Sequence, residues 1–134
     1  MTQTWQEAAR VALDGTETDT MSFPEGLRLL MDAGFDGYAV DFRKASRTYY
    51  RPEGTALTLE TTPVATPVAA DFDAAAVQVA IREAQAMVSG YTYRGFCAKV
   101  AGAGCAGYLV SLSGRRVLYY GRSGETHTEH FPAP

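Results

Sequence analysis

Residues 33–40 read AGFDGYAV, and residues 103–110 read AGCAGYLV. A shift of 70 positions aligns the two stretches without a gap, and the same shift aligns a pair of tyrosines and a glycine further along the chain. The matched pairs are Ala33/Ala103, Gly34/Gly104, Gly37/Gly107, Tyr38/Tyr108, Val40/Val110, Tyr49/Tyr119, Tyr50/Tyr120 and Gly54/Gly124. This agreement predicts an internal duplication. Because one copy is too small to bury much surface, both copies are expected to share one core.

Each copy carries signals for two helices and three strands. The stretch SFPE places Ser22 three residues before Glu25, a capping-box pattern that predicts the start of a helix. Gly34 is placed to end that helix in the left-handed conformation. The alternation of apolar residues over 38–42 then predicts a strand. In the second copy, Ser-Gly at 113–114 separates two β-rich runs, which predicts a two-residue hairpin turn.

These signals together predict an α+β fold in a single domain spanning 1–134. The sheet should hold about six antiparallel strands with the helices on one face and a pseudo-twofold relation between the copies. The copies should cover about 1–62 and 71–132, joined by a proline-containing linker at 63–70.

Composition narrows the class of protein. Of the 134 residues, 46% are hydrophobic and 20% charged, which is typical of a globular domain. The N-terminal sequence lacks the pattern of a secretory signal, and no apolar run reaches the length of a membrane span. Two cysteines in this context indicate reduced thiols, so we expect a cytoplasmic protein. The net charge of −3 argues against a nucleic-acid partner, although residues 91–124 carry basic and no acidic side chains.

The copies differ at four positions where packing alone would keep them alike. Leu27, Phe35, Leu57 and Leu59 of the first copy correspond to Cys97, Cys105, His127 and Glu129 of the second. In a strand His127 and Glu129 share one face, so the carboxylate could orient the imidazole and raise its basicity. Either cysteine could then act as a thiolate nucleophile. The favoured alternative is that both cysteines are small core residues and that the last strand is solvated.

The same residues are the candidates for a metal site. Cys97, Cys105, His127 and His130 could supply sulfur and nitrogen ligands. The cysteines are eight positions apart, and two histidines three apart in a strand point to opposite faces, so the spacing does not fit a zinc site. We therefore expect no metal and no cofactor.

Tyrosines and arginines form the candidate ligand site. Adjacent residues in a strand face opposite ways, so one tyrosine of each Tyr-Tyr pair should lie in the core. A surface across the pseudo-twofold axis could then hold a small anionic or aromatic ligand, or a second protein molecule. Its candidate residues are Tyr38, Arg43, Arg47, Tyr108 and Arg116. The alternative is a strand face carrying exposed ion pairs of little energetic value.

The chain resembles the YbcV-like family of bacterial proteins, a domain of unknown function, over essentially its whole length. The resemblance is carried by SFPEGLRLLMDAGFDGYAVDFR, TYYRPEG, FDAAAVQVAIREAQ and GYLVSLSGRRVLYYGRSGETHTEHFP. Some members of that family are associated with prophages and carry the label phage envelope protein. The resemblance implies a bacterial single-domain protein and brings with it no catalytic residue.

Three function classes follow from the sequence. The first is a non-catalytic small-ligand-binding or regulatory module with a cleft between the two copies. The second is a homo-oligomeric structural or interaction protein, for instance a homodimer associated with a prophage. The third and least favoured is a cysteine-dependent enzyme using His127 and Glu129.

Overall fold

The computed structural model describes residues 3–131 and shows one helix–helix–three-strand pattern twice. The N-terminal unit comprises α1 (Trp5–Glu17), α2 (Phe23–Asp32), β1 (Gly37–Asp41), β2 (Ser46–Tyr50) and β3 (Ala56–Glu60). The C-terminal unit comprises α3 (Ala74–Ala86), α4 (Tyr93–Gly102), β4 (Cys105–Ser111), β5 (Arg116–Gly121) and β6 (Thr126–His130). The α+β class predicted from the sequence is confirmed. None of the helices within residues 3–131 is long and apolar enough to cross a membrane.

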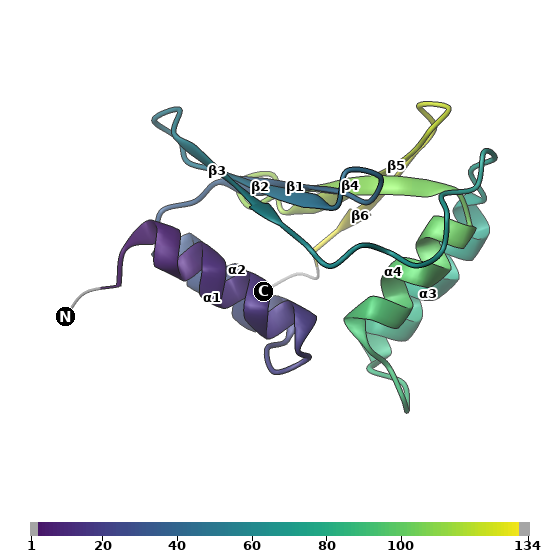
Figure 1. Cartoon of the computed structure of the whole chain (residues 1–134), viewed down its shortest axis with the longest axis horizontal. Helices are drawn as coiled ribbons and strands as arrows, with labels where there is room; N and C mark the ends of the chain where they lie inside the picture. Colours follow the sequence, from purple (N-terminus) through teal and green to yellow (C-terminus); the bar gives the residue numbers. More distant parts are fainter. Residues whose placement is uncertain (1–2, 132–134) are drawn as a thin grey trace.

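The six strands form one antiparallel sheet in the order β3-β2-β1-β4-β5-β6. The units meet where β1 pairs with β4, with Val40 opposite Tyr108. Figure 1 shows all four helices on one face of this sheet, α1 and α2 beneath its β3 side and α3 and α4 beneath its β5 side. The segment from β3 to α3 crosses the helix side of the sheet between these two helix pairs.

Local signals set the ends of the second helix in each unit. Ser22 and Glu25 form the complete capping box at the start of α2, and the Thr92 side chain accepts a hydrogen bond from the backbone of Gly95 at the start of α4. Both helices end before a glycine with positive φ, 90° at Gly34 and 92° at Gly104. Such a conformation favours glycine because it has no Cβ. Because α2 and α4 end in the same way, the chain enters β1 and β4 in equivalent orientations.

Aromatic side chains fill the space between the sheet and the helices. Tyr38, Tyr49, Tyr108 and Tyr119 are all buried on the helix-facing side. Their rings are neighbours, with centroids 5.4 Å apart for Tyr38 and Tyr49 and 6.4 Å apart for Tyr38 and Tyr108. Tyr50 is 42% exposed on the opposite face. The prediction that one tyrosine of each adjacent pair lies in the core is thus confirmed.

The loop between β4 and β5 differs from its prediction. Ser111 pairs with Arg116, so the loop has the four residues 112–115 rather than two. The Ser111 hydroxyl accepts a hydrogen bond from the backbone of Gly114 at 2.8 Å, which stabilises the wider turn. In the N-terminal unit, the carboxylate of Asp41 accepts from the backbone of Lys44 at 3.0 Å in the same way. A side chain at the strand end, rather than the Ser-Gly pair, sets the loop length.

The equivalent glycines allow a test of how tightly the linker packs. An added Cβ at Gly104 meets the backbone of Asp71 and Phe72, whereas one at Gly34 meets only the end of the Arg51 side chain, at 3.2 Å. Both alanine substitutions incur left-handed strain of about 1–2 kcal/mol. We expect Gly104→Ala to lower the free energy of unfolding by about 1–3 kcal/mol more than Gly34→Ala, because backbone atoms must move. Urea denaturation measures the difference, and equal losses would contradict the packing described.

Candidate functional site

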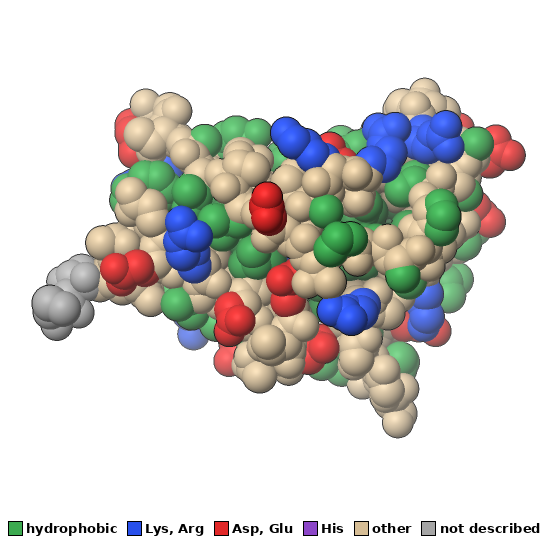
Figure 2. Space-filling view, viewed as in Figure 1, with side chains coloured by type: hydrophobic (Ala, Val, Ile, Leu, Met, Phe, Trp, Pro, Cys, Tyr) green, Lys and Arg blue, Asp and Glu red, His purple; other side chains and the backbone are tan. Residues whose placement is uncertain are grey.

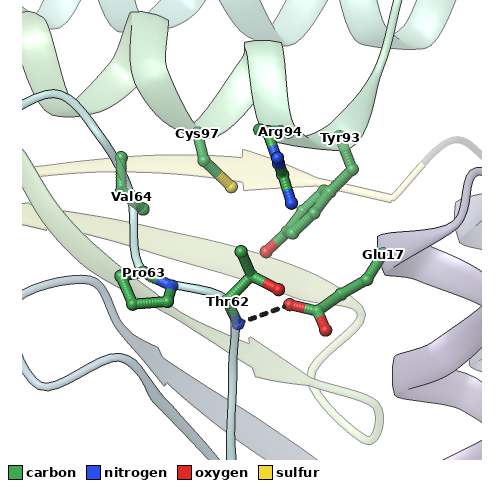
Figure 3. A pocket seen from close by; sticks show the side chains of 7 residues that line it. All are labelled: Glu17, Thr62, Pro63, Val64, Tyr93, Arg94 and Cys97. Atoms are coloured by element: carbon green, nitrogen blue, oxygen red, sulfur yellow. Dashed lines mark hydrogen bonds between the residues drawn. The ribbon is translucent and has the colours of Figure 1, made fainter.

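A small pocket lies where the two units meet on the helix side of the sheet. It is lined by the last residue of α1, the first half of α4 and the start of the segment between β3 and α3, which includes the linker. These residues are Glu17, Tyr93, Arg94, Cys97, Thr62, Pro63 and Val64. Figure 3 shows the hydroxyl of Tyr93 pointing toward Thr62, with the carboxylate of Glu17 nearby. The cavity is about 30 Å³, enough for one or two water-sized groups.

Tyr93 is held in place at the start of α4. Its backbone N–H donates to the carboxylate of Asp19 at 2.8 Å, a contact that joins the α1–α2 loop to the second helix pair. Its ring stacks on Phe96, with centroids 6.2 Å apart. Its hydroxyl accepts a hydrogen bond from Nη2 of Arg47 at 2.7 Å. The tyrosine therefore connects the pocket to a side chain on β2.

Arg47 is the charged side chain at the centre of the molecule, and the residue is 2% exposed. Its Nη2 also donates to the hydroxyl of Tyr108 at 3.3 Å. The guanidinium lies 4.9 Å from the ring centre of Tyr38 and 5.5 Å from that of Tyr93. Within residues 3–131 it forms no ion pair, and its buried Nε has no hydrogen-bond partner. The protein thus encloses a positive charge among tyrosines.

The energetics of this arrangement are nearly balanced. Burying a guanidinium costs on the order of several kcal/mol. A hydrogen bond from a charged donor returns about 1.5–3 kcal/mol, and each desolvated cation–π contact returns about 2 kcal/mol. The tyrosines therefore offset most of the desolvation of Arg47, and an anion close to the cluster would stabilise it further.

The position of Arg47 follows from strand alternation. Arg47 and Tyr49 are two residues apart on β2, so the burial of Tyr49 turns Arg47 toward the helices as well. The sequence-based hypothesis places Arg47, Tyr38 and Tyr108 on a surface that could hold a ligand. The structure buries all three, and their role in ligand binding stays a prediction. The residue equivalent to Arg47 at the 70-residue offset is Val117, also buried. The buried arginine is therefore a difference between the units.

The other two candidate arginines lie away from this cluster. Arg43 is exposed in the loop after β1, and Arg116 is exposed at the start of β5. Since Gly37 pairs with Ser111 in the antiparallel β1–β4 ladder, these loops lie at opposite ends of the sheet. Of the predicted ligand residues, the structure brings together Tyr38, Arg47 and Tyr108 only.

Both cysteines are free and buried. Burial raises the pKa of Cys97 to about 11, although the Tyr93 hydroxyl and the Arg47 charge lower it. Burial likewise raises the pKa of Cys105 to about 11, although backbone hydrogen bonds at Gly107 and Tyr120 lower it. Each side chain is therefore a neutral thiol at pH 7. This geometry favours a packing role for both residues.

His127 and Glu129 do meet, as the period of two in β6 predicts. The imidazole Nε2 lies 2.9 Å from Oε1 of Glu129, and Oε2 of Glu129 pairs with Arg82 of α3 at 3.2 Å. Burial alone would raise the pKa of Glu129, but hydrogen bonds from His127 and Arg82 and their charges lower it below 4.5 overall. Among the contacts described for these two residues, neither thiol appears. The pair ties the edge strand to α3.

Within residues 3–131, neither a cluster of metal ligands nor a larger hollow offers a better candidate site. Within residues 3–131, no group of three or more His, Cys, Asp or Glu side chains is arranged to hold a metal ion. A larger hollow of about 120 Å³ lies between α3 and α4, near their connecting loop. Its charged residues, Glu83 and Lys99, already pair with each other at 2.9 Å. Figure 2 shows acidic and basic side chains interspersed over the helix pairs. The pocket at the junction of the units differs from this hollow because it adjoins Arg47, a buried charge that forms no ion pair within residues 3–131.

Residues 53–129 match a family model described as "Protein of unknown function (DUF1398)". The chain belongs to the DUF1398 family. The match begins in the turn before β3 and ends within β6, so it covers the linker and nearly all of the C-terminal unit of this DUF1398 protein. It includes Tyr93 and Tyr108 but not Arg47 or Glu17. No curated protein matches the sequence.

Two site residues of this DUF1398 protein escape sequence-based reasoning. Tyr93 and Glu17 acquire their roles from contacts with segments more than 40 positions away, Arg47 and Thr62 respectively. The 70-residue offset holds one signal that could have indicated Tyr93, because its equivalent is Phe23, which has no hydroxyl. Glu17 offers no comparable signal, since it is an acidic residue at the end of an amphipathic helix.

The lowered pKa of Glu129 predicts a loss of stability in acid. A carboxyl group whose pKa is lower in the folded than in the unfolded protein stabilises the fold above about pH 4.5, and this contribution disappears as the pH falls through the folded value. Glu129→Gln should be less stable than the native chain at pH 6 and lose less stability between pH 5 and 3. Denaturant titrations across this range measure the effect, and parallel pH profiles would contradict it.

The raised pKa values of the two cysteines predict slow thiol chemistry. With a pKa of about 11 instead of the ordinary value near 8.5, each thiol has a thiolate population at pH 7 lower by a factor of about 100 or more. Reaction with an aromatic disulfide reagent should be at least that much slower in the native protein than in urea. One cysteine reacting at the unfolded rate would contradict this and revive the nucleophile hypothesis.

Proposed function

We propose that the protein is a non-catalytic small-ligand-binding or regulatory module whose site is the pocket at the junction of its two units. The observation that carries the proposal is that this pocket ends at Tyr93, which is hydrogen-bonded to the buried Arg47, and Arg47 forms no ion pair within residues 3–131. Sites at the junction of two units suit small ligands because both sides contribute polar groups. The site is also positioned for regulation, since a ligand there would contact α1, α4 and the linker together.

The pocket offers few but distinct groups to a ligand. Pro63 and Val64 supply an apolar side, Tyr93 a buried hydroxyl, and Arg94 and Glu17 charges of opposite sign. The carboxylate of Glu17 already accepts a hydrogen bond from the backbone of Thr62 at 2.8 Å, which fixes the linker next to α1. Both thiols are buried, and the described contacts of His127 include neither of them, so the proposal assigns no catalytic role to these residues.

A pocket-filling substitution tests the proposal. Thr62 is exposed and lines the pocket, and Ala65 is exposed on the same linker outside it. In Thr62→Trp, a bulky side chain should block the pocket while the backbone bond to Glu17 remains. Native mass spectrometry of protein purified without chelators should show excess mass that vanishes on denaturation, retained in Ala65→Trp and lost in Thr62→Trp.

The same measurement can contradict the proposal. A native mass equal to that of the bare chain, in protein exchanged into the small-molecule fraction of a bacterial lysate, would do so. Excess mass retained by Thr62→Trp would place the ligand elsewhere.

A homo-oligomeric interaction protein is the second candidate function, and one feature favours it. Leu109 is 42% exposed on the sheet face opposite the helices, with Ala39 and Leu118 beside it on neighbouring strands. A row of apolar side chains on an uncovered face is suited to contact a second copy. The prophage association suggested by the YbcV-like resemblance belongs with this candidate. A native mass of two chains that reverts to one in Leu109→Glu would support it.

A further inference from the structure

Nη2 of Arg47 and the hydroxyls of Tyr93 and Tyr108 form a hydrogen-bonded set in which one hydroxyl proton has no acceptor. Nη2 of Arg47 donates to the hydroxyls of both Tyr93 and Tyr108, and these two hydroxyls lie 2.7 Å apart. Burial, the largest cause, raises the pKa of Tyr93 and of Tyr108 well above 10, so both hydroxyls keep their protons at pH 7. One proton is used in the bond between the tyrosines, and the other needs a different acceptor.

The pocket is where that second proton can find an acceptor. When Tyr108 donates to Tyr93, the Tyr93 hydroxyl proton is free to point into the cavity that this residue lines. Figure 3 shows its oxygen directed toward the space beside Thr62. The neighbouring acceptor on α4 is the Cys97 thiol, and sulfur accepts hydrogen bonds only weakly. An acceptor in the pocket could therefore take the Tyr93 proton, and it would lie close to Arg47, whose Nη2 is 2.7 Å from that hydroxyl and which forms no ion pair within residues 3–131.

We propose that the pocket binds a small monocarboxylate, which accepts a hydrogen bond from the Tyr93 hydroxyl and serves as the counter-ion of Arg47. This rests on the proposed function and specifies its ligand. Arg47 would attract the ligand electrostatically without touching it, because the Tyr93 hydroxyl lies between them. Arg94 supplies a second positive charge at the pocket.

Size and charge together select this class of anion. The cavity of about 30 Å³ holds one or two water-sized groups, so it would take the two oxygens of a carboxylate while the rest of a short ligand extends outward beside Pro63 and Val64. The buried charge of Arg47 balances a single negative charge, and the opposite charges of Arg94 and Glu17, which both line the pocket, offset each other. A phosphate dianion is larger, and its second charge would lie close to the carboxylate of Glu17, which also lines the pocket. A small planar monoanion satisfies both the size of the cavity and its charge.

Sequence differences between the two units predict one such site per chain rather than two. At the 70-residue offset, Tyr93 corresponds to Phe23 and Arg47 to Val117. The N-terminal unit therefore lacks both the hydroxyl and the charge, so we expect one carboxylate per chain. Phe23 and Val117 also show that an apolar side chain can occupy each of these two positions in a unit that lacks the site.

Acetate is the probe, titrated against chloride at constant ionic strength and pH 7 while the melting temperature is followed. We expect a saturable rise in the melting temperature with acetate for the native chain. Removal of one hydrogen bond to a charged group should weaken acetate binding about tenfold or more in Tyr93→Phe, and removal of the charge should do the same in Arg47→Met. Tyr50→Phe, which alters an exposed tyrosine, should bind acetate as the native chain does.

Two further comparisons separate recognition from structure. Glu17→Gln removes a repelling charge from the pocket and should bind acetate several-fold more tightly. Without acetate, Arg47→Met should melt at the same or a higher temperature than the native chain, because it removes a buried charge that lacks a counter-ion. If Arg47 instead serves only the fold, Arg47→Met will melt at a lower temperature with or without acetate, and Tyr93→Phe will leave the acetate effect unchanged.

Three outcomes would overturn the inference. They are equal melting temperatures in acetate and chloride, an acetate effect that survives both Tyr93→Phe and Arg47→Met, and saturation by inorganic phosphate but not by acetate. If native mass spectrometry still shows a ligand that Thr62→Trp excludes, the proposed function stands and only its carboxylate chemistry fails. If Thr62→Trp changes neither the retained mass nor the melting temperature in acetate, both proposals fail together.

Discussion

The pairing of β1 with β4 is the contact on which the candidate site depends. It joins two three-stranded units into one sheet and places Val40 of one unit opposite Tyr108 of the other. The helix-facing tyrosines of both units then become neighbours beneath the centre of the sheet. Because Arg47 lies two residues before Tyr49 on β2 and faces the same side, its guanidinium lies in that aromatic layer as well. The burial of one charge is thus a consequence of how the units are joined.

A protein that needed only stability would have little reason to keep this arginine. A valine occupies the equivalent place in the C-terminal unit and is buried without a polar group to satisfy. Replacing a buried charge by an apolar side chain is often neutral or stabilising. The tyrosines that surround Arg47 offset most of its desolvation but supply no negative charge. The proposed anionic ligand would add the missing charge to this preformed set of donors.

Much of the architecture could be predicted because local chemistry determines it. The capping box at Ser22, the glycines that end α2 and α4, and the alternation along each strand all act within a few residues, and each appears in the structure as expected. The pairing of His127 with Glu129 follows from the same alternation. The β4–β5 loop was mispredicted because the Ser111 side chain, rather than the turn residues, decides its length.

The site could be predicted only in part, because contacts between distant segments create it. Arg47 and Tyr38 were candidates, yet their burial depends on which face the helices cover. Tyr93 reaches Arg47 across 46 positions of sequence, and no local pattern contains that information.

The most direct measurement of the central claim is a pair of high-resolution crystal structures, one grown from acetate and one from an acetate-free chloride solution. We predict planar density within hydrogen-bond distance of the Tyr93 hydroxyl in the first structure, and Arg47 without a carboxylate partner in the second. A Glu17 carboxylate turned inward to bond Tyr93 in both structures would contradict the account, because the protein would then supply its own counter-ion.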